Sequence, residues 1–291
     1  MKRFGWSRAR QLERKIEVMN SLAELRRNWE GLAQADPLWA ICTDPERRES
    51  KWSPEEFFAT GQDEIRRVLE CVECLGLRVD RSAPALDFGC GVGRLTRAMS
   101  GYFPECWGVD ISPTMLRLAA EFNHDEPSCK FVLNNRRDLN SVEDDYFGFV
   151  YSNIVLQHMS PRLCARYLKE MVRVTRPHGI LVFAAVEAFR VGWLAQLRQK
   201  IGVRRTLRRF SLRKKGNYSM DLHAFAEGRI RCVMQIAGAT VVDARWTNSA
   251  DPCFNGKLKY LEGEPAPGFV SKQYCAVKQQ PMPESRGRTG A

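Results

Sequence analysis

The first part of the chain has the apolar spacing of amphipathic helices. One helix is predicted from Pro54 to about Gly76, because Ser53 can cap its first turn and proline is favoured there. The polar stretch from Asp80 to Pro84 then predicts a boundary between this helical N-terminal part and the rest of the chain. An earlier helix is predicted over residues 11–32, where apolar side chains recur every three or four positions, at Ile16, Met19, Leu22, Leu25 and Trp29.

From Ala85 the pattern changes to short apolar runs that alternate with helical stretches. Alternating strands and helices predict a doubly wound α/β fold built on a parallel sheet. A helix over Leu222–Ala237 precedes two further strands, Thr240–Trp246 and Val270–Val277. The earlier runs that we interpret as strands are Ala85–Phe88, Glu105–Val109, Lys130–Leu133, Phe149–Asn153 and Gly179–Ala185.

Length and composition restrict the classes of protein that fit this pattern. The chain has 291 residues, 27% of them charged, and no apolar run long enough to cross a bilayer. Its basic N-terminus lacks the apolar stretch of a signal peptide, and its cysteine content is low for a disulfide scaffold, so we expect a cytoplasmic protein with reduced thiols. Cys71 and Cys74 have no second pair at zinc-site spacing, so we expect no metal site.

The strongest chemical signal is the segment ALDFGCGVGRL, residues 85–95. An apolar strand carries an acid, Asp87, and Gly89, Gly91 and Gly93 follow before a helix. Glycine permits a tight turn and lets the backbone approach a ligand closely, while the start of the helix offers unpaired N–H groups. A dinucleotide fingerprint would need glycine where this chain has Arg94, so the spacing argues against a nicotinamide cofactor.

These residues resemble the first motif of the class I S-adenosylmethionine-dependent methyltransferases. Three further segments resemble later motifs of that family in the same order: GVDISPTML from Gly108, SNIVLQHM from Ser152 and VTRPHGILVF from Val174. The resemblance covers about residues 80–280. It implies a Rossmann-like, doubly wound, seven-stranded and mostly parallel sheet with helices on both faces. It also implies an N-terminal helical lid and a basic helical insertion after the fifth strand.

The resemblance further implies S-adenosyl-L-methionine as cofactor. Asp110 would accept hydrogen bonds from both ribose hydroxyls, and Ile111 would lie beside the adenine. After the third strand the family has an aspartate that contacts the adenine amino group. This chain has Asn135 and Arg136 there, and Asp138 is the alternative assignment. A second departure from the family is Gly148, which stands in place of an aspartate. The full set of expected cofactor-binding residues is Asp87, Gly89, Cys90, Gly91, Gly93, Asp110, Ile111, Asn135, Arg136 and Asn153.

The methyl group of this cofactor is already electrophilic, so few residues need be catalytic. An aliphatic hydroxyl acceptor must lose its proton as it attacks, which calls for a base that titrates near neutrality. His158, just after the fourth strand, is the candidate base; packing or capping a short helix is its alternative role. His223 is the candidate substrate residue, with an ordinary place in a first helical turn as its alternative.

We therefore expect methyl transfer to a hydroxyl group of a small-molecule or glycan-like acceptor, which could be anionic. N-methylation and RNA methylation are the enzymatic alternatives, and nucleic acid ranks lower because the chain has no recognisable RNA-binding module. The third alternative is a non-catalytic protein that binds the cofactor and acts through an interaction surface. The retained Asp87, Asp110 and three glycines argue against it.

The net charge of +11 comes mainly from residues 190–215, which contain ten Lys or Arg and no Asp or Glu. As a basic amphipathic helix this segment could contact an anionic membrane, a phosphate of the acceptor or RNA, or it could be a solvated lid, the interpretation we prefer. We expect a helical extension over 1–81, a methyltransferase domain over 82–280 with an insertion at 187–220, and a disordered tail at 281–291. The expected location is the cytoplasm, with peripheral membrane contact as an addition.

Overall fold

The computed structural model of the chain describes residues 22–189, 220, 222–263 and 269–280. The basic segment 190–215, the tail 281–291 and the first part of the predicted N-terminal helix lie outside the described residues. Within the described ranges, no helix combines the length and the apolar character needed to cross a membrane. The ten cysteines are free thiols.

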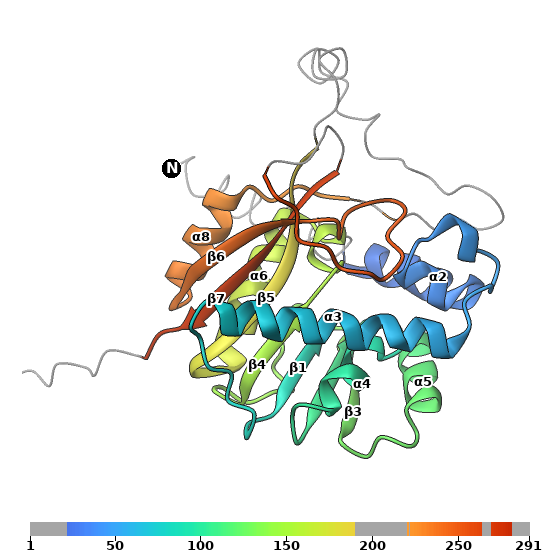
Figure 1. Cartoon of the computed structure of the whole chain (residues 1–291), viewed down its shortest axis with the longest axis horizontal. Helices are drawn as coiled ribbons and strands as arrows, with labels where there is room; N and C mark the ends of the chain where they lie inside the picture. The colour runs from blue at the N-terminus through green and yellow to red at the C-terminus, as the bar shows by residue number, and fades with distance from the viewer. Residues whose placement is uncertain (1–21, 190–219, 221, 264–268, 281–291) are drawn as a thin grey trace, which may run out of the picture.

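A seven-stranded sheet forms the centre of the molecule (Figure 1). The strands are β1 (Ala85–Phe88), β2 (Cys106–Asp110), β3 (Cys129–Leu133), β4 (Phe147–Ser152), β5 (Thr175–Phe189), β6 (Ala239–Thr247) and β7 (Phe269–Lys278). Their order is β3-β2-β1-β4-β5-β7-β6. The pairs among β1 to β5 are parallel, whereas β7 runs antiparallel to β5 and β6. The predicted doubly wound, mostly parallel sheet is confirmed.

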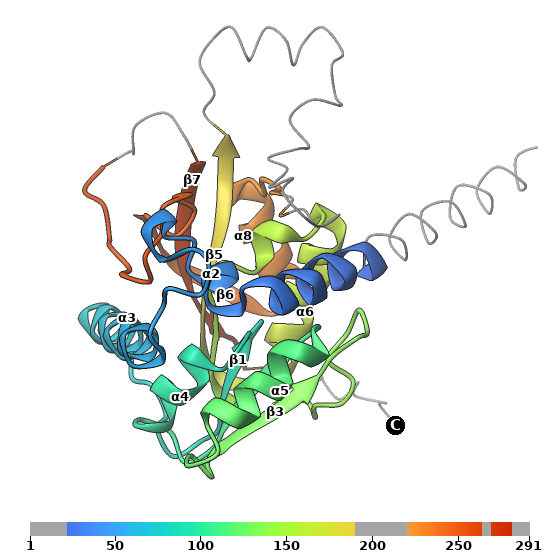
Figure 2. The ribbon, with the colours of Figure 1, turned by 90° about the vertical axis from the view of Figure 1, so that its right-hand side faces the viewer.

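Helices cover both faces of the sheet (Figure 2). The elements are α2 (Pro37–Ile41), η1 (Pro45–Arg47), α3 (Pro54–Cys74), α4 (Arg94–Ser100), α5 (Pro113–Phe122), η2 (Leu156–His158), α6 (Pro161–Val174) and α8 (Glu227–Ile236). α3 and α4 pack on one face, where Ile65 shares a core with Phe149 and Ile180. α6 and α8 pack on the other, around Val150 and Leu181. Successive residues of β4 and β5 thus serve opposite cores, as the two-residue period of a strand requires.

The N-terminal part of the described chain packs against the carboxyl end of the sheet. A helix of residues 22–35 and α2 contribute Leu32 and Trp39 to a third core, which also contains Val92 of the glycine turn and Met115 of α5. α3 packs on the sheet, because it shares a core with the strands. From Pro54 onward, the expected extension therefore covers one face of the sheet.

One predicted boundary is wrong by a full helical turn. The helix predicted from Leu222 begins at Glu227. Residues 222–226 lie outside any helix or strand, and two of their backbone N–H groups have tertiary partners. The N–H of His223 donates to the carbonyl of Gln157 at 2.7 Å, and the N–H of Phe225 donates to Val186 at 2.8 Å. These bonds satisfy the backbone without a helix, which the local sequence pattern does not reveal.

Candidate functional site

The glycine turn after β1 is closely surrounded by side chains. Gly89 and Gly91 have φ angles of +82° and +53°, in the left-handed region that favours glycine. A Cβ atom on Gly89 would lie 2.3 Å from Val155, and one on Gly91 would lie 2.5 Å from Ile41. Both the backbone conformation and the surrounding space therefore require glycine at these two positions.

Asp110, the last residue of β2, lies beside this turn. One carboxylate oxygen accepts the backbone N–H of Gly91 and the other accepts that of Ser112, both at 2.9 Å. Burial raises the pKa of Asp110, although the two backbone hydrogen bonds oppose that effect. Each oxygen retains a lone pair for a further donor. The carboxylate is thus fixed in position and able to accept the paired hydroxyls of a ribose.

Asp87 in β1 is buried and only half satisfied. Its Oδ2 accepts a hydrogen bond from the hydroxyl of Thr96 at 2.8 Å, while Oδ1 is buried without a partner among the described residues. Desolvation raises the pKa of Asp87 to about 7, against the opposing effects of Thr96 and the Arg94 guanidinium. A cation bound nearby would favour the ionised carboxylate.

A cavity of about 890 Å³, measured with its open mouth, lies at the carboxyl ends of β1 to β4. This end of a doubly wound sheet is where such folds bind ligands. Its polar lining consists of the glycine turn with Asp110, Arg94, Asn134 and Asn153. Apolar and aromatic side chains form most of the remainder, among them Leu25, Trp29, Ile41, Ile111, Val155, Met159 and Tyr167. The cavity thus combines a mainly apolar lining with polar groups gathered at the strand ends.

A buried polar network supports the side of this cavity next to β4. One oxygen of Glu64, in α3, accepts hydrogen bonds from Tyr151 at 2.8 Å and from the amide of Asn153 at 2.7 Å. Its other oxygen forms an ion pair with Arg94 at 2.8 Å. The carbonyl oxygen of Asn153 is left buried without a partner in the described part of the chain. A ligand with a hydrogen-bond donor would satisfy Asn153, and a positive charge on it would favour the ionised form of Asp87 behind the cavity wall.

The structure brings most of the predicted cofactor residues to this cavity. Gly89, Cys90, Gly91, Asp110, Ile111 and Asn153 line it. Asp87 and Gly93 are absent from the described lining and support the turn from β1 and from the start of α4.

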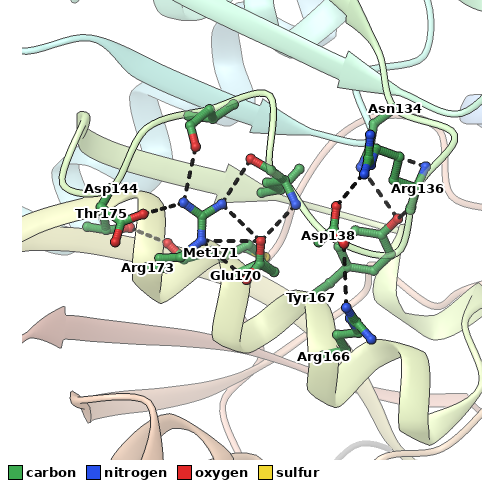
Figure 3. Close-up of polar contacts among 12 residues, drawn as sticks. Asn134, Arg136, Asp138, Asp144, Arg166, Tyr167, Glu170, Met171, Arg173 and Thr175 are labelled. Atoms are coloured by element: carbon green, nitrogen blue, oxygen red, sulfur yellow. Dashed lines mark hydrogen bonds and ion pairs between the residues drawn. The ribbon is translucent and has the colours of Figure 1, made fainter.

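After β3 the cavity is lined by Asn134, one position before the predicted pair. Asn134 is buried, and its amide donates to the hydroxyl of Tyr167 in α6 at 3.4 Å (Figure 3). Asn135 and Arg136 are exposed and line a neighbouring groove instead. The signal that could have located Asn134 is the strand end itself, because the residue directly after a parallel strand faces the crevice.

The candidate base His158 and the candidate substrate residue His223 lie close to each other in the fold but outside the described cavity lining. His158, in η2, is buried, and its ring packs edge-on against Trp29 with the ring centroids 5.0 Å apart. Trp29 itself lines the cavity. His223 is joined to η2 through its backbone hydrogen bond to Gln157. The fold therefore brings together two histidines that are 65 positions apart in the sequence.

The helix of residues 22–35 closes the cavity from above the sheet. Leu25 and Trp29 of this helix contribute to the lining. Glu30 fastens the helix to the start of α5, because its carboxylate accepts the hydroxyl of Ser112 at 2.6 Å and the N–H of Thr114 at 3.2 Å. Burial acts to raise the pKa of Glu30, but these hydrogen bonds outweigh it and lower the pKa. The apolar spacing in the sequence predicts the apolar face of this helix but not its contact with the site.

The comparison with known protein families agrees with this geometry. Residues 86–183 match a family described as a methyltransferase domain. The chain is 35% identical over 100 residues to 2-methyl-6-phytyl-1,4-hydroquinone methyltransferase of Synechocystis sp., and the match covers 34% of this chain and 30% of that protein. It is 28% identical over 158 residues to carboxy-S-adenosyl-L-methionine synthase of Chromohalobacter salexigens, covering 50% of this chain and 58% of that protein. The chain thus spans less than two thirds of either relative.

Solved structures of the same fold include enzymes bound to the expected nucleoside. Magnesium protoporphyrin IX methyltransferase from Synechocystis, solved with S-adenosylhomocysteine, superposes with a TM-score of 0.51 at 14% identity over 83% of this chain and 93% of that one. An S-adenosylmethionine-dependent methyltransferase from Clostridium acetobutylicum gives a TM-score of 0.52 at 14% identity over 77% and 92%. These likenesses concern the fold.

The matched segment contains the glycine turn, Asp110 and the strand ends that form the cavity. The family resemblance seen in the sequence is thereby confirmed, as is S-adenosylmethionine as the cofactor that it implies. The chain carries a class I S-adenosylmethionine-dependent methyltransferase domain.

Proposed function

We propose that this protein transfers the methyl group of S-adenosylmethionine to a hydroxyl oxygen of a small-molecule or glycan-like acceptor. The observation that supports it most strongly is the cavity that unites the glycine turn, Asp110 and Asn153 at one end of the sheet. When bound, the cofactor supplies an electrophilic sulfonium methyl group. The domain division expected from the sequence, with a methyltransferase unit over 82–280, belongs to this proposal, as do a cytoplasmic location and peripheral membrane contact.

The residues of the cavity have distinct proposed roles. Asp110 binds the ribose hydroxyls, and Asn134 offers polar contacts to the adenine. The free carbonyl oxygen of Asn153, together with Asp87, favours the ammonium end of the cofactor. The apolar lining excludes water, so that the methyl group is transferred to the acceptor and not to solvent.

His158 is the proposed proton acceptor. Its support is its place in η2, directly after β4, and its contact with Trp29 of the cavity wall. His158 would take the hydroxyl proton as the acceptor oxygen is methylated, while the cofactor would supply the methyl group and keep the electron pair of the broken carbon–sulfur bond. A general base of this kind contributes roughly 10²- to 10⁴-fold to a rate. His223 is proposed as a contact for the acceptor.

The first experiment tests the cofactor site by calorimetry with S-adenosylhomocysteine. We expect wild-type protein to bind with a Kd on the order of micromolar, which corresponds to a binding free energy of about 8 kcal/mol. Asp110→Ala should lose most of that affinity. NAD is the control ligand and should not bind. No binding to the wild type would contradict the methyltransferase proposal, and equal binding to both proteins would contradict the role of Asp110.

The second experiment tests the acceptor class with methyl-labelled S-adenosylmethionine. Hydroxylated sugars and other alcohols are offered beside amines and RNA, and label in an alcohol product supports O-methylation. His158→Gln should lower kcat and remove the ionisation of a group near neutrality from the pH–rate profile, while His124→Gln, in an exposed loop, should leave both unchanged. Transfer only to amines, or to RNA, would replace the hydroxyl proposal. Cofactor binding with no transfer to any arm would favour the non-catalytic alternative.

A further inference from the structure

A second cavity lies beside the cofactor cavity, at the carboxyl end of β3. It is lined by residues 22–30 of the N-terminal helix, by residues 135–138 after β3 and by Arg166 of α6. Ile111 lines both cavities, so the two are neighbours. Five of the lining residues are arginines: Arg26, Arg27, Arg136, Arg137 and Arg166. We call this cavity the arginine groove.

The positive charge of the arginine groove is not compensated by its own acids. Only two carboxylates line it among the described residues, those of Glu30 and Asp138, which leaves a net charge of +3. Glu30 is occupied by Ser112 and Thr114, and Asp138 is shared between Arg136 and Arg166, each 3.4 Å away.

Three arginines of the groove have no counter-charge among the residues that the structure describes. None of Arg26, Arg27 and Arg137 forms an ion pair with an acid of the described residues. Guanidinium groups gathered in a concavity repel one another, so an anion bound between them would be favourable.

The loop that carries Arg136 and Arg137 is held in place by α6. The N–H of Arg136 donates to the side chain of Asn134 at 3.1 Å, and its carbonyl accepts the hydroxyl of Tyr167 (Figure 3). One turn further along α6, Glu170 accepts the N–H of Leu139 at 2.8 Å. Because these contacts fix the backbone, this wall of the groove is formed before any ligand binds.

The N-terminal helix forms the opposite wall through its residue spacing. Leu22, Arg26 and Glu30 are four residues apart and therefore lie on one face, which lines the groove. Leu25 and Trp29 lie on the adjacent face and line the cofactor cavity. A single helix thus separates two sites of opposite character, one apolar and one cationic.

We propose that the arginine groove binds a phosphate-bearing ligand. Arginine presents a planar fork of N–H donors that matches phosphate oxygens, and a phosphate has enough oxygens to accept forks from more than one wall. The groove is concave and lies between three elements, which suits a phosphate group better than the flat surface of a protein partner. This inference goes beyond the proposed methyl transfer and does not depend on it.

The position of the groove makes it an anchoring site and not the site of methyl transfer. In the sheet, β3 is separated from β4 by β2 and β1. Three strand spacings of about 4.8 Å place the ends of β3 and β4 about 14 Å apart. The groove wall formed by residues 135–138 therefore lies on the nucleoside side of the cofactor cavity.

The test is calorimetric titration of the full-length protein with inorganic pyrophosphate at low ionic strength. We expect saturable binding that weakens as salt is added, because the groove is exposed. Arg27→Gln/Arg137→Gln should bind pyrophosphate at least about tenfold more weakly, since both charged donors are lost. The matched control is Arg67→Gln/Arg78→Gln, which removes the same charge near α3 and should bind as the wild type does.

Two further measurements make the outcome unambiguous. S-adenosylhomocysteine binding should be the same in both double variants, which separates failure of the groove from failure of the cofactor site or of folding. Flotation with phosphatidylcholine vesicles, with and without phosphatidylglycerol, identifies the source of the phosphate. Groove-dependent binding to the anionic vesicles alone supports a lipid headgroup. Groove-dependent binding of pyrophosphate supports a soluble phosphate. Absence of both, or equal loss in the control variant, would overturn the proposal.

Discussion

The cofactor cavity and the arginine groove share one helix and one residue, yet they are built in different ways. The cofactor cavity is formed by backbone at the glycine turn and by buried side chains whose polar atoms are mostly paired. The groove is formed by exposed arginines from three elements. A site built from backbone depends on local conformation, whereas a site built from long side chains depends on which elements the fold places side by side. The same kind of residue should therefore matter very differently in the two regions.

The largest expected difference concerns two arginines. Arg94 is buried and paired with Glu64, so Arg94→Met leaves an uncompensated carboxylate in the interior and should lower the free energy of unfolding by about 3–5 kcal/mol. Arg27→Met, at the exposed groove, should change it by less than about 0.5 kcal/mol. Urea unfolding at an unchanged m-value measures both. Glu64→Gln/Arg94→Met should recover part of the loss, and similar losses at Arg94 and Arg27 would refute the contrast.

Next in size is the cost of adding one methyl group to the glycine turn. Gly89→Ala combines a left-handed backbone with a Cβ atom 2.3 Å from Val155 and should cost about 3 kcal/mol, together with loss of S-adenosylhomocysteine binding. Gly76→Ala is the matched control, because its φ is +74° but nothing lies within 4 Å of the added atom. It should cost about 1 kcal/mol and leave binding intact. An equal cost at both positions would mean that crowding by Val155 is unimportant.

A smaller effect follows from the raised pKa of Asp87. Since the pKa is about 7 without ligand, the carboxyl is protonated below that pH, and a cationic cofactor must displace the proton. S-adenosylmethionine should bind about tenfold more weakly at about pH 6 than at about pH 8. Calorimetry in buffers of different ionisation enthalpy should detect proton release on binding. In Asp87→Asn both the pH dependence and the proton release should disappear.

The same ionisation predicts how stability varies with pH. The folded protein holds this proton more tightly than the unfolded chain, whose aspartate pKa is near 4, so the contribution of Asp87 is fully present below about pH 4 and is lost as the pH rises through about 7. Asp87→Asn should therefore gain stability relative to the wild type as the pH rises. The opposite trend would show that folding lowers the pKa of Asp87 instead of raising it.

The smallest effect is expected at the helix that separates the two sites. Glu30→Gln keeps the side-chain shape but weakens the bonds from Ser112 and Thr114, which should lower the free energy of unfolding by about 1 kcal/mol or less. Because the pKa of Glu30 is lowered on folding, this contribution is present at neutral pH and is lost as the solution becomes acidic. Glu24→Gln, exposed on the same helix, is the control and should change nothing.

Most of the sheet could be predicted because its signals are local. Each predicted strand overlaps an observed one, and β1 has the predicted limits of Ala85 and Phe88. β5 begins at Thr175, before the predicted Gly179, because Thr175 pairs with Phe147 of β4. That pairing partner lies far away in the sequence, so the apolar pattern around Gly179 could not indicate it.

The candidate site was only partly predictable for the same reason. Residues that follow directly from a strand end or from a glycine turn, such as Gly89, Gly91 and Asp110, lie at the cavity. Trp29 and Tyr167 were not anticipated, because each comes from a helix whose position over the site depends on packing. Asn134 was missed by one position, although the predicted strand ends at Leu133 as β3 does, because the adenine contact was assigned from the family motif and not from the strand end.

The sequence by itself determined the order of strands and helices, the glycine turn and the acid that ends β2. These features follow from side-chain periodicity and from backbone conformations that glycine alone adopts easily. Only the tertiary structure decided that α3 packs on the sheet, that Glu30 holds a helix over the cofactor cavity, and that five arginines line one groove. Those outcomes depend on contacts between segments far apart in the chain, which the free energy of packing selects and no local pattern records.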